Sequence, residues 1–149
     1  KYIKEQIELI KRLATKGFSY ETSKAIYFNV RKFPNYTKLS GQSLDDKSIG
    51  ARSEVVVDKQ KKHPADFVLW FKLTGRFKSH ILHWPSPWGE GFPGWHLECS
   101  AMAMNTLGDT VDIHCGGVDH ISIHHTTKLP KVKPLPAKLL CATGCTANF

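Results

Sequence analysis

The stretch Trp84-Pro-Ser-Pro-Trp-Gly-Glu-Gly-Phe-Pro-Gly-Trp-His-Leu-Glu-Cys-Ser100 decides how the fold is interpreted. It holds three of the four tryptophans of the chain, together with three prolines and three glycines. Proline removes a backbone donor and fixes its own φ, and glycine weakens both helices and strands. The stretch before Gly94 is therefore predicted to be a rigid loop, neither helix nor strand, that wraps another part of the molecule.

A helix is predicted from Trp95 to Leu107, directly after this loop. Leu97, Ala101 and Met104 recur at steps of three and four residues, and Gly108 supplies a stop signal.

The first residues of this helix are candidates for a functional site. Trp95, His96 and Cys99 lie at the predicted junction of loop and helix, where backbone N–H groups are free and the helix dipole favours a thiolate. The residues alone leave a second interpretation open, in which Cys99 is a buried apolar cysteine and Trp95 fills the core.

The remaining pattern alternates between helix and strand, which indicates an α/β unit. The continuous apolar run Phe67–Phe71, between Pro64 and Gly75, is typical of a strand buried on both faces. The other predicted elements are an amphipathic helix over Lys1–Lys16 ended by Gly17, a β-hairpin of Phe18–Tyr20 and Ala25–Val30, a strand over Glu54–Asp58, a solvated basic turn over Lys59–His63, and a strand over Thr110–His114. A glycine turn, Cys115–Asp119, and the histidines 120, 124 and 125 follow the last strand, at the end where ligands collect in such sheets.

Composition narrows the class of protein. A chain of 149 residues with 41% hydrophobic residues is long enough and apolar enough to form a core. It has no apolar run of membrane-spanning length and no signal-peptide pattern, so we expect neither a membrane span nor secretion. Four cysteines do not make a disulfide framework in a chain of this length and favour a reducing cytoplasm. The net charge of +8 suits either a nucleic-acid partner or a soluble basic surface.

Zinc is a possible ligand on residue chemistry alone. Cys99 and His124 are suitable zinc ligands at the ends of predicted elements. Their spacing is not that of a zinc finger, Cys141 and Cys145 form only a loose pair, and the histidines could equally be surface or core residues. The residues themselves leave these alternatives open.

Several motifs, in this order along the chain, resemble cysteinyl-tRNA synthetase, a family of class I aminoacyl-tRNA synthetases. The resemblance runs from residue 1 to about residue 125. The motifs are Phe67-Val-Leu-Trp70, Ser86-Pro-Trp-Gly89, Gly94-Trp-His-Leu-Glu-Cys-Ser-Ala-Met102, Leu107-Gly-Asp-Thr-Val-Asp-Ile-His114, Gly116-Gly-Val-Asp119 and His124-His125.

The resemblance implies a function and a site. The family activates cysteine with ATP and Mg²⁺ and transfers it to tRNA(Cys), as a cytoplasmic and monomeric enzyme. Its zinc is held by two cysteines, a histidine and a glutamate, and binds the thiolate of the substrate. Cys99 matches the second cysteine and His124 the histidine, which also approaches the substrate. Trp95 matches the tryptophan that packs over bound cysteine, and Gly116, Gly117 and Asp119 match the turn near the adenosine.

The resemblance also implies a division of the chain. Residues 1–62 match a connective segment with an inserted β-hairpin, and residues 63–125 match the second half of the Rossmann-like catalytic domain, whose parallel sheet would be incomplete here. Without the earlier strands, Phe67–Phe71 is expected to expose an apolar edge. The chain is expected to be an inactive internal fragment that lacks the first cysteine ligand, the His-Ile-Gly-His motif and the Lys-Met-Ser-Lys-Ser loop.

Residues 126–149 depart from the family. They contain four lysines, three prolines and no acidic residue, and Lys128 stands where the family has its glutamate ligand. Cys115 also replaces the usual glycine of the nucleotide turn. Permissible codons for the tail, read one base earlier, can encode the family's continuation after His125. We therefore expect a frameshift and a disordered tail here.

Two other hypotheses remain. The chain could be a small basic module that binds zinc or nucleic acid, which its charge and its His and Cys content favour weakly. The lack of a pattern that predicts stacked aromatic rings on a basic face argues against that module. The chain could also be the unused remnant of a broken gene.

Overall fold

The computed structural model describes residues 1–33, 36 and 58–108. Its elements are α1 (Ile3–Thr15), β1 (Ser19–Glu21), β2 (Ala25–Phe28), η1 (Val30–Lys32), β3 (Phe67–Lys72), η3 (Gly75–Phe77), β4 (Gly91–Pro93) and α2 (Trp95–Leu107). The predicted strands over Glu54–Asp58 and Thr110–His114, the glycine turn, the histidines 120, 124 and 125, and the tail lie outside the described residues, apart from Asp58. Neither α1 nor α2 is long and apolar enough to cross a membrane.

Helix α1 is amphipathic, as its apolar spacing predicts. Leu9, Ile10 and Leu13 are buried on one face. The helix ends in a Schellman motif, in which the amide of Gly17 donates to the carbonyl of Ala14 and the amide of Phe18 donates to that of Leu13. Gly17 has a φ of 73°, which a residue with a Cβ adopts only at a cost.

The four strands form one sheet in the order β1-β2-β3-β4, and every neighbouring pair is antiparallel. The predicted β-hairpin is confirmed, because Tyr20 on β1 pairs directly with Tyr27 on β2. The predicted strand over Phe67–Phe71 is also confirmed as β3.

The expectation of a parallel sheet is wrong for these strands. β3 pairs antiparallel with β2 on one side and with β4 on the other, so it is an interior strand and not an exposed apolar edge. Leu69 and Trp70, which are neighbours on β3, are both completely buried. A continuous apolar run thus reports burial, and it carries no information about the direction of the neighbouring strands.

The loop before α2 also contains a strand that was not predicted, β4. An antiparallel bridge joins Trp84 to Gly91, and a tight turn connects them, with the amide of Gly89 donating to the carbonyl of Ser86. The loop wraps Trp70, whose ring lies 6.4 Å from that of Trp88. β4 approaches β3 closely at Gly91, where a Cβ would lie 2.1 Å from the carbonyl oxygen of Phe71, so glycine is needed there.

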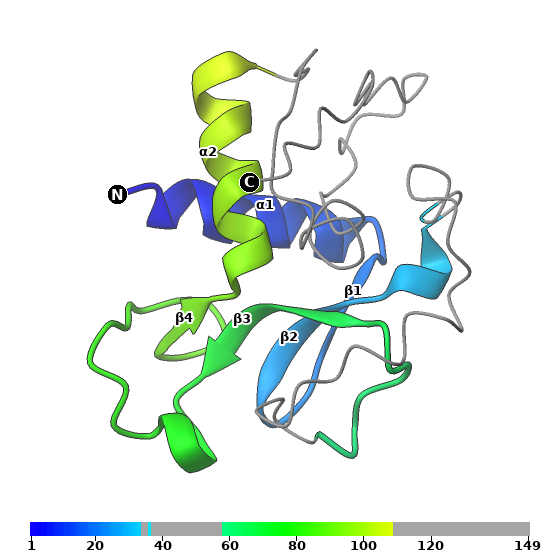
Figure 1. The fold of residues 1–149 in the computed structure, drawn as a ribbon, viewed down its shortest axis with the longest axis vertical. Helices are drawn as coiled ribbons and strands as arrows, with labels where there is room; N and C mark the ends of the chain where they lie inside the picture. The colour runs from blue at the N-terminus through cyan, green and yellow to red at the C-terminus, as the bar shows by residue number, and fades with distance from the viewer. Residues whose placement is uncertain (34–35, 37–57, 109–149) are drawn as a thin grey trace, which may run out of the picture.

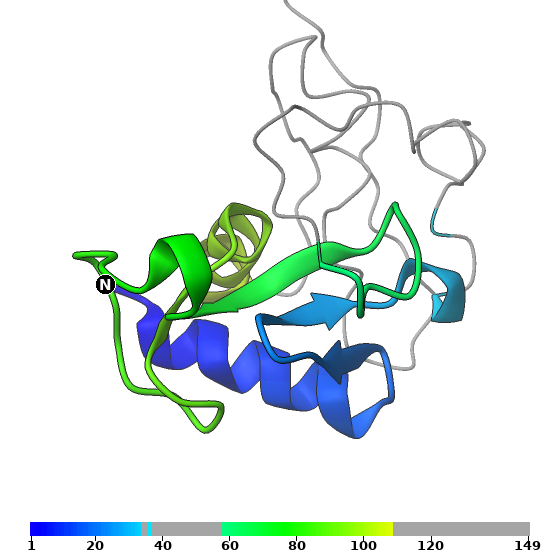
Figure 2. The ribbon, with the colours of Figure 1, turned by 90° about the horizontal axis from the view of Figure 1, so that it is seen from below.

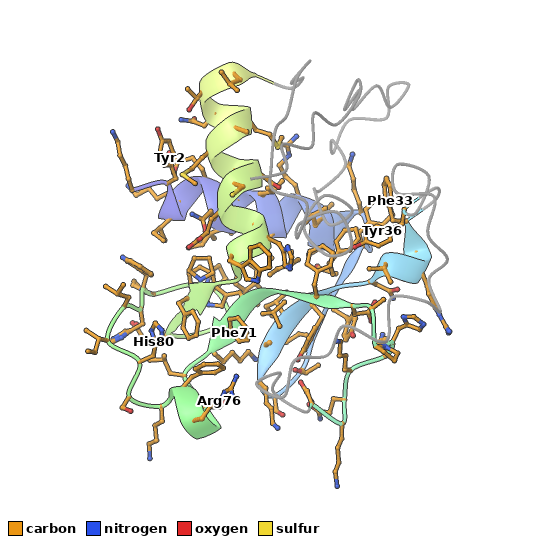
Figure 3. The ribbon with its side chains drawn as sticks, in the orientation of Figure 1. Tyr2, Phe33, Tyr36, Phe71, Arg76 and His80 are labelled. Carbon is orange, nitrogen blue, oxygen red and sulfur yellow. The ribbon has the colours of Figure 1, made fainter. Side chains whose placement is uncertain are left out.

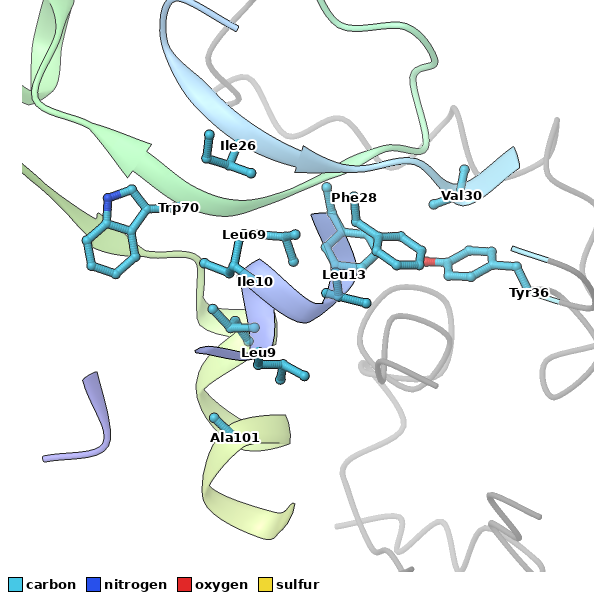
Figure 4. Close-up of a cluster of buried hydrophobic side chains, with 12 residues drawn as sticks. Leu9, Ile10, Leu13, Ile26, Phe28, Val30, Tyr36, Leu69, Trp70 and Ala101 are labelled. Atoms are coloured by element: carbon cyan, nitrogen blue, oxygen red, sulfur yellow. The ribbon is translucent and has the colours of Figure 1, made fainter. Parts of the chain in front are cut away.

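The helices α1 and α2 lie on the same face of the sheet (Figures 1 and 2). The core between the layers is drawn from both helices, from β2 and β3, and from the residues that follow β2 (Figure 4). Its buried members are Leu9, Ile10, Leu13, Ile26, Phe28, Val30, Tyr36, Phe67, Leu69, Trp70, Leu97 and Ala101. This packing fixes where α2 begins relative to β3, and with it the position of Trp95.

Candidate functional site

The start of α2 is set by a close contact with β3. The amide of Gly94, the N-cap of the helix, donates to the carbonyl of Leu69 at 2.9 Å. A Cβ at Gly94 would lie only 2.1 Å from the carbonyl oxygen of Val68, so no larger residue fits without movement. The helix spans Trp95–Leu107 as the sequence predicts, with Gly108 as its C-cap.

Trp95 and His96 begin a chain of ring contacts at this junction. Their ring centroids are 3.9 Å apart, and the ring of His96 also contacts that of Phe67 at 5.1 Å. Phe67 in turn stacks on Phe28 in the core, at 5.0 Å. His96 is buried, whereas 49% of Trp95 is exposed. The interpretation of Trp95 as core filling is therefore wrong, and its indole packs against the buried ring of His96.

Cys99 is an exposed free thiol, so the alternative of a buried apolar cysteine is also wrong. The sequence predicts Cys99 at the junction with the loop, beside the free amides. In the structure it begins the second turn of α2 and lies beyond those amides. Residues four and seven positions apart share a helix face, so Trp95, Cys99 and the exposed Met102 form one stripe. The opposite stripe, which contains Leu97 and Ala101, enters the core.

A hollow of about 310 Å³ opens beside Trp95, at the point where β4 ends and α2 begins. β4 pairs with Trp70–Lys72 only, so the hollow lies along the earlier part of β3. Its lining combines aromatic, cationic and acidic side chains with the start of α2: Tyr27, Lys61, Asp66, Phe67, Val68, Phe71, Arg76, Gly94, Trp95 and His96.

A polar network holds the segment before β3 against the β-hairpin. Asp66 accepts hydrogen bonds from the hydroxyl of Tyr20 at 2.7 Å and from the amide of Val30 at 3.0 Å. Asp58 accepts one from the hydroxyl of Thr22 at 2.8 Å. Both carboxylates are buried, at 2% and 8% exposure. The expected solvated turn over Lys59–His63 is thus only partly solvated, because His63 is buried and Lys61 is half-buried.

Burial and these contacts shift several pKa values. Burial raises the pKa of Tyr27 well above its usual range, and the nearby Asp58 adds to the effect. The pKa of Tyr20 is raised in the same way by burial, with a contribution from Asp66. Burial alone would raise the pKa of Asp58, but hydrogen bonds, first from the amide of Gln60, lower it on balance. Burial lowers the pKa of Lys61, against the opposing effect of the carboxylates.

The face of the sheet opposite α1 and α2 carries aromatic rings from all four strands, and we call it the outer face. Tyr20 stacks on Tyr27 at 5.6 Å, and Phe71 stacks on Phe92 at 4.9 Å. Cations lie over three of the rings on this side: Lys61 over Tyr27, Lys62 over Tyr20 and Arg76 over Phe77. These rings are largely covered, because Tyr27 is buried and His80 stacks on Phe92 at 3.9 Å.

The described residues contain only part of the predicted site. Trp95 and Cys99 lie one helical turn apart on one exposed stripe, whereas His124, Gly116, Gly117 and Asp119 lie outside the described residues. Within residues 1–33, 36 and 58–108, no three or more His, Cys, Asp and Glu side chains form a group that could hold a metal ion. The exposed sulfur of Cys99 would suit zinc as one ligand.

Sequence reasoning missed the hollow and the outer face. The available signal for the outer face is the presence of one tyrosine on each strand of the hairpin, Tyr20 and Tyr27, because paired residues point to the same face. Nothing local indicated that the segment from Asp58 to Asp66 would pack beside them.

Comparisons with known proteins agree with the motifs around this site. A family model described as tRNA synthetases class I (C) catalytic domain matches residues 1–135. The chain is 48% identical over 128 residues to the cysteine–tRNA ligase of Treponema denticola. The aligned region covers 86% of this chain and 25% of that protein. It is 50% identical over 134 residues to that of Shouchella clausii, covering 90% and 28%. It is 44% identical over 132 residues to that of Thermus thermophilus, covering 89% and 26%. The chain thus spans about a quarter of the length of these curated relatives.

Proposed function

Because the chain belongs to the class I tRNA synthetase (C) catalytic-domain family, we propose that it is part of a cysteine–tRNA ligase that activates cysteine with ATP and charges tRNA(Cys). One observation carries the proposal beyond the family match. Trp95 and Cys99, which the motif assigns to the substrate and to the metal, are both exposed on one stripe of α2. We also propose a cytoplasmic location and a requirement for Mg²⁺ with ATP.

Cys99 and His124 are proposed to be two of the zinc ligands. When bound, zinc would supply a soft Lewis acid that prefers the sulfur of cysteine to the hydroxyl of serine. The contribution of the protein at Cys99 is a thiolate presented by a rigid helix whose opposite stripe is buried in the core. Lys128, at the position of the family's glutamate, does not contribute a ligand.

Trp95 is proposed to pack over the side chain of bound cysteine. Its ring packs on that of His96, which in turn contacts Phe67, so the exposed indole presents a fixed apolar surface. A fixed surface of this kind selects a small side chain by shape and excludes water from the thiolate. Gly116, Gly117 and Asp119 are proposed to contact the adenosine of ATP.

The antiparallel sheet changes the division of the chain that we propose. β3 and β4 continue the sheet begun by β1 and β2, so the connective segment extends through β4 to the start of α2. The Rossmann-like parallel sheet of the catalytic domain remains a proposal for the part of the protein outside the described residues. In this arrangement α2 carries the chain from the connective sheet to the catalytic half.

A chimera tests the proposed function. Residues 1–125 replace the matching segment of the Treponema denticola cysteine–tRNA ligase, and cysteine-dependent ATP–pyrophosphate exchange is measured. We expect exchange with cysteine and none with serine. Exchange that prefers another amino acid would contradict the assignment.

Substitutions in the chimera then test the roles of individual residues. Cys99→Ser should reduce both bound zinc and exchange by at least about 100-fold, because removing even an outer-shell partner of a metal costs about 10- to 100-fold. Ser100→Ala is the matched control, since its hydroxyl only contacts the carbonyl of His96 within the helix. Equal exchange by Cys99→Ser and Ser100→Ala would exclude Cys99 as a ligand.

A further inference from the structure

The amine of Lys61 is a nucleophile that the function proposed above does not use. It lines the same hollow as Trp95, the residue that we assign to bound cysteine, and it is the single lysine among the described residues that do so. The other cation of the lining is Arg76, which lies on the side of the sheet away from α1 and α2 (Figure 3). A guanidinium stays protonated, so of the two cations only Lys61 can supply an electron pair.

The side chain of Lys61 is held in place at the wall of the hollow. Its Nζ donates to the carbonyl of Pro64 at 2.6 Å and lies 6.0 Å from the ring centroid of Tyr27. The segment around it is fixed in turn, because Asp58 and Asp66 are buried and accept hydrogen bonds from the hairpin. The contact with Pro64 is the one hydrogen bond of this Nζ within the described part of the chain, so a neutral amine would keep its electron pair available.

The surroundings favour this neutral amine. Lys61 is half-buried, and burial lowers its pKa, while Asp66 and Asp58 oppose the shift without cancelling it. Neither carboxylate forms an ion pair with Lys61, since the ion pairs of the described residues lie elsewhere. A desolvated lysine without a close counter-charge is an activated nucleophile.

The proposed function would bring an electrophile to this place. Activation of cysteine by ATP joins its carboxylate to the phosphate of AMP and releases pyrophosphate, which leaves an acyl carbon open to attack. A hollow of about 310 Å³ beside Trp95 is large enough for this acyl group. Arg76 adds a permanent positive charge to the lining, which favours a phosphate as the leaving group.

We propose that Lys61 is an acceptor of activated cysteine, so that the protein modifies itself at this residue. The inference rests on the proposed function, which supplies cysteinyl-AMP. The neutral Nζ attacks the acyl carbon, an amide bond forms, and the bond from that carbon to the phosphate oxygen breaks. AMP leaves with the electron pair of this bond, and the nitrogen loses its surplus proton to solvent. The step needs neither an oxidant nor a reductant.

The 149-residue chain treated with chemically prepared cysteinyl-AMP tests the acceptor without relying on activation by ATP. The protein is reduced and digested, and tandem mass spectrometry locates the added cysteinyl residue. We expect it on Lys61 ahead of the other lysines. The amide should survive hydroxylamine, which cleaves a thioester on Cys99. The rate should reach half its maximum at a lower pH than that of a lysine in an unstructured peptide, because burial lowers the pKa of Lys61.

Two variants distinguish this site from general acylation of lysines. Lys61→Arg keeps the positive charge but removes the nucleophile, and should lose the modification completely. Lys62→Arg is the matched control, because the neighbouring Lys62 is exposed and its ammonium lies over a different ring, that of Tyr20. It should leave the modification of Lys61 unchanged. Circular dichroism confirms that both variants keep the helices.

The chimera, given cysteine, ATP and Mg²⁺ without tRNA, should acquire the same modification, and none when ATP is omitted. The inference is overturned if prepared cysteinyl-AMP does not modify Lys61, if Lys61 and Lys62 are modified equally, or if a chimera active in exchange stays unmodified. That last result rejects this inference alone. A chimera inactive in exchange, together with a chain that prepared cysteinyl-AMP modifies at Lys61, rejects the proposed function and supports the acceptor.

Discussion

Replacing Gly94 with alanine is the sharpest perturbation of the contact that positions α2. The backbone of Gly94 has a φ of −73° and a ψ of 137°, which alanine adopts without strain. The only obstacle is the new Cβ, which would lie 2.1 Å from the carbonyl oxygen of Val68. To reach an ordinary contact, β3 and the start of α2 must separate by roughly 1 Å.

The cost follows from what this separation breaks. Overpacking of a close contact costs about 1–3 kcal/mol. The hydrogen bond from the amide of Gly94 to Leu69 is weakened, which costs about 1 kcal/mol. Alanine is also a poorer N-cap than glycine, by up to about 1 kcal/mol. We therefore expect the free energy of unfolding to fall by about 3 kcal/mol.

Two further variants separate the effect of overpacking from that of capping. Unfolding in urea is monitored by the fluorescence of the tryptophans around the site. Gly94→Ser restores a favourable N-cap but keeps the Cβ, so it should remain nearly as unstable as Gly94→Ala. Gly89→Ala introduces a Cβ in open space at a φ of 98°, and should cost only about 1–2 kcal/mol. A Gly94→Ser protein as stable as wild type would show that capping, and not the contact with Val68, makes glycine necessary.

Three other changes have expected outcomes. Gln6→Met should raise the free energy of unfolding by about 1 kcal/mol in a thermal melt, because Oε1 of Gln6 is buried without a hydrogen-bond partner; a lower melting temperature would contradict this. Asp66→Asn should cost about 1–3 kcal/mol in urea unfolding, since Tyr20 and Val30 donate to different carboxylate oxygens and an amide keeps only one of them, and an unchanged midpoint would refute the network. The raised pKa of Tyr27 means that the unfolded chain loses this proton first as pH rises, so the stabilisation is complete below about pH 10 and is lost above it. Tyr27→Phe should reduce that alkaline loss, by at most about 1.4 kcal/mol per pH unit, in unfolding measured from pH 9 to 11; an unchanged slope would contradict it.

Local sequence signals were sufficient for the helices and the hairpin. The predicted bounds of α2 match the structure because glycines stand at both of its ends and Leu97 and Ala101 recur at helical spacing. Gly17 ended α1 for the same reason. β3 was recognised as a strand from its apolar run, but its antiparallel pairing was not, because the pairing depends on residues about 40 positions earlier in the chain.

The polar network shows why the site could be predicted only in part. Lys59–His63 is rich in charge, and such a segment is usually solvated. Asp58 and Asp66 become buried because their partners, Thr22 and Tyr20, arrive from the hairpin. No local pattern encodes a hydrogen bond between residues this far apart, so the pKa shifts and the hollow emerge only from the fold.

The motif around Cys99 combines residues that pack against the sheet and the core with residues that are exposed to solvent. Gly94 fixes the backbone against β3, His96 and Leu97 are buried, and Trp95 and Cys99 face outward. The helical period alone puts those two side chains on one stripe, but the buried residues between them determine where the stripe points. If this coupling holds, Gly94→Ala in the chimera should impair exchange more than Gly89→Ala even at temperatures where both proteins are folded. Equal exchange by the two variants would mean that the placement of Trp95 does not depend on the contact between α2 and β3.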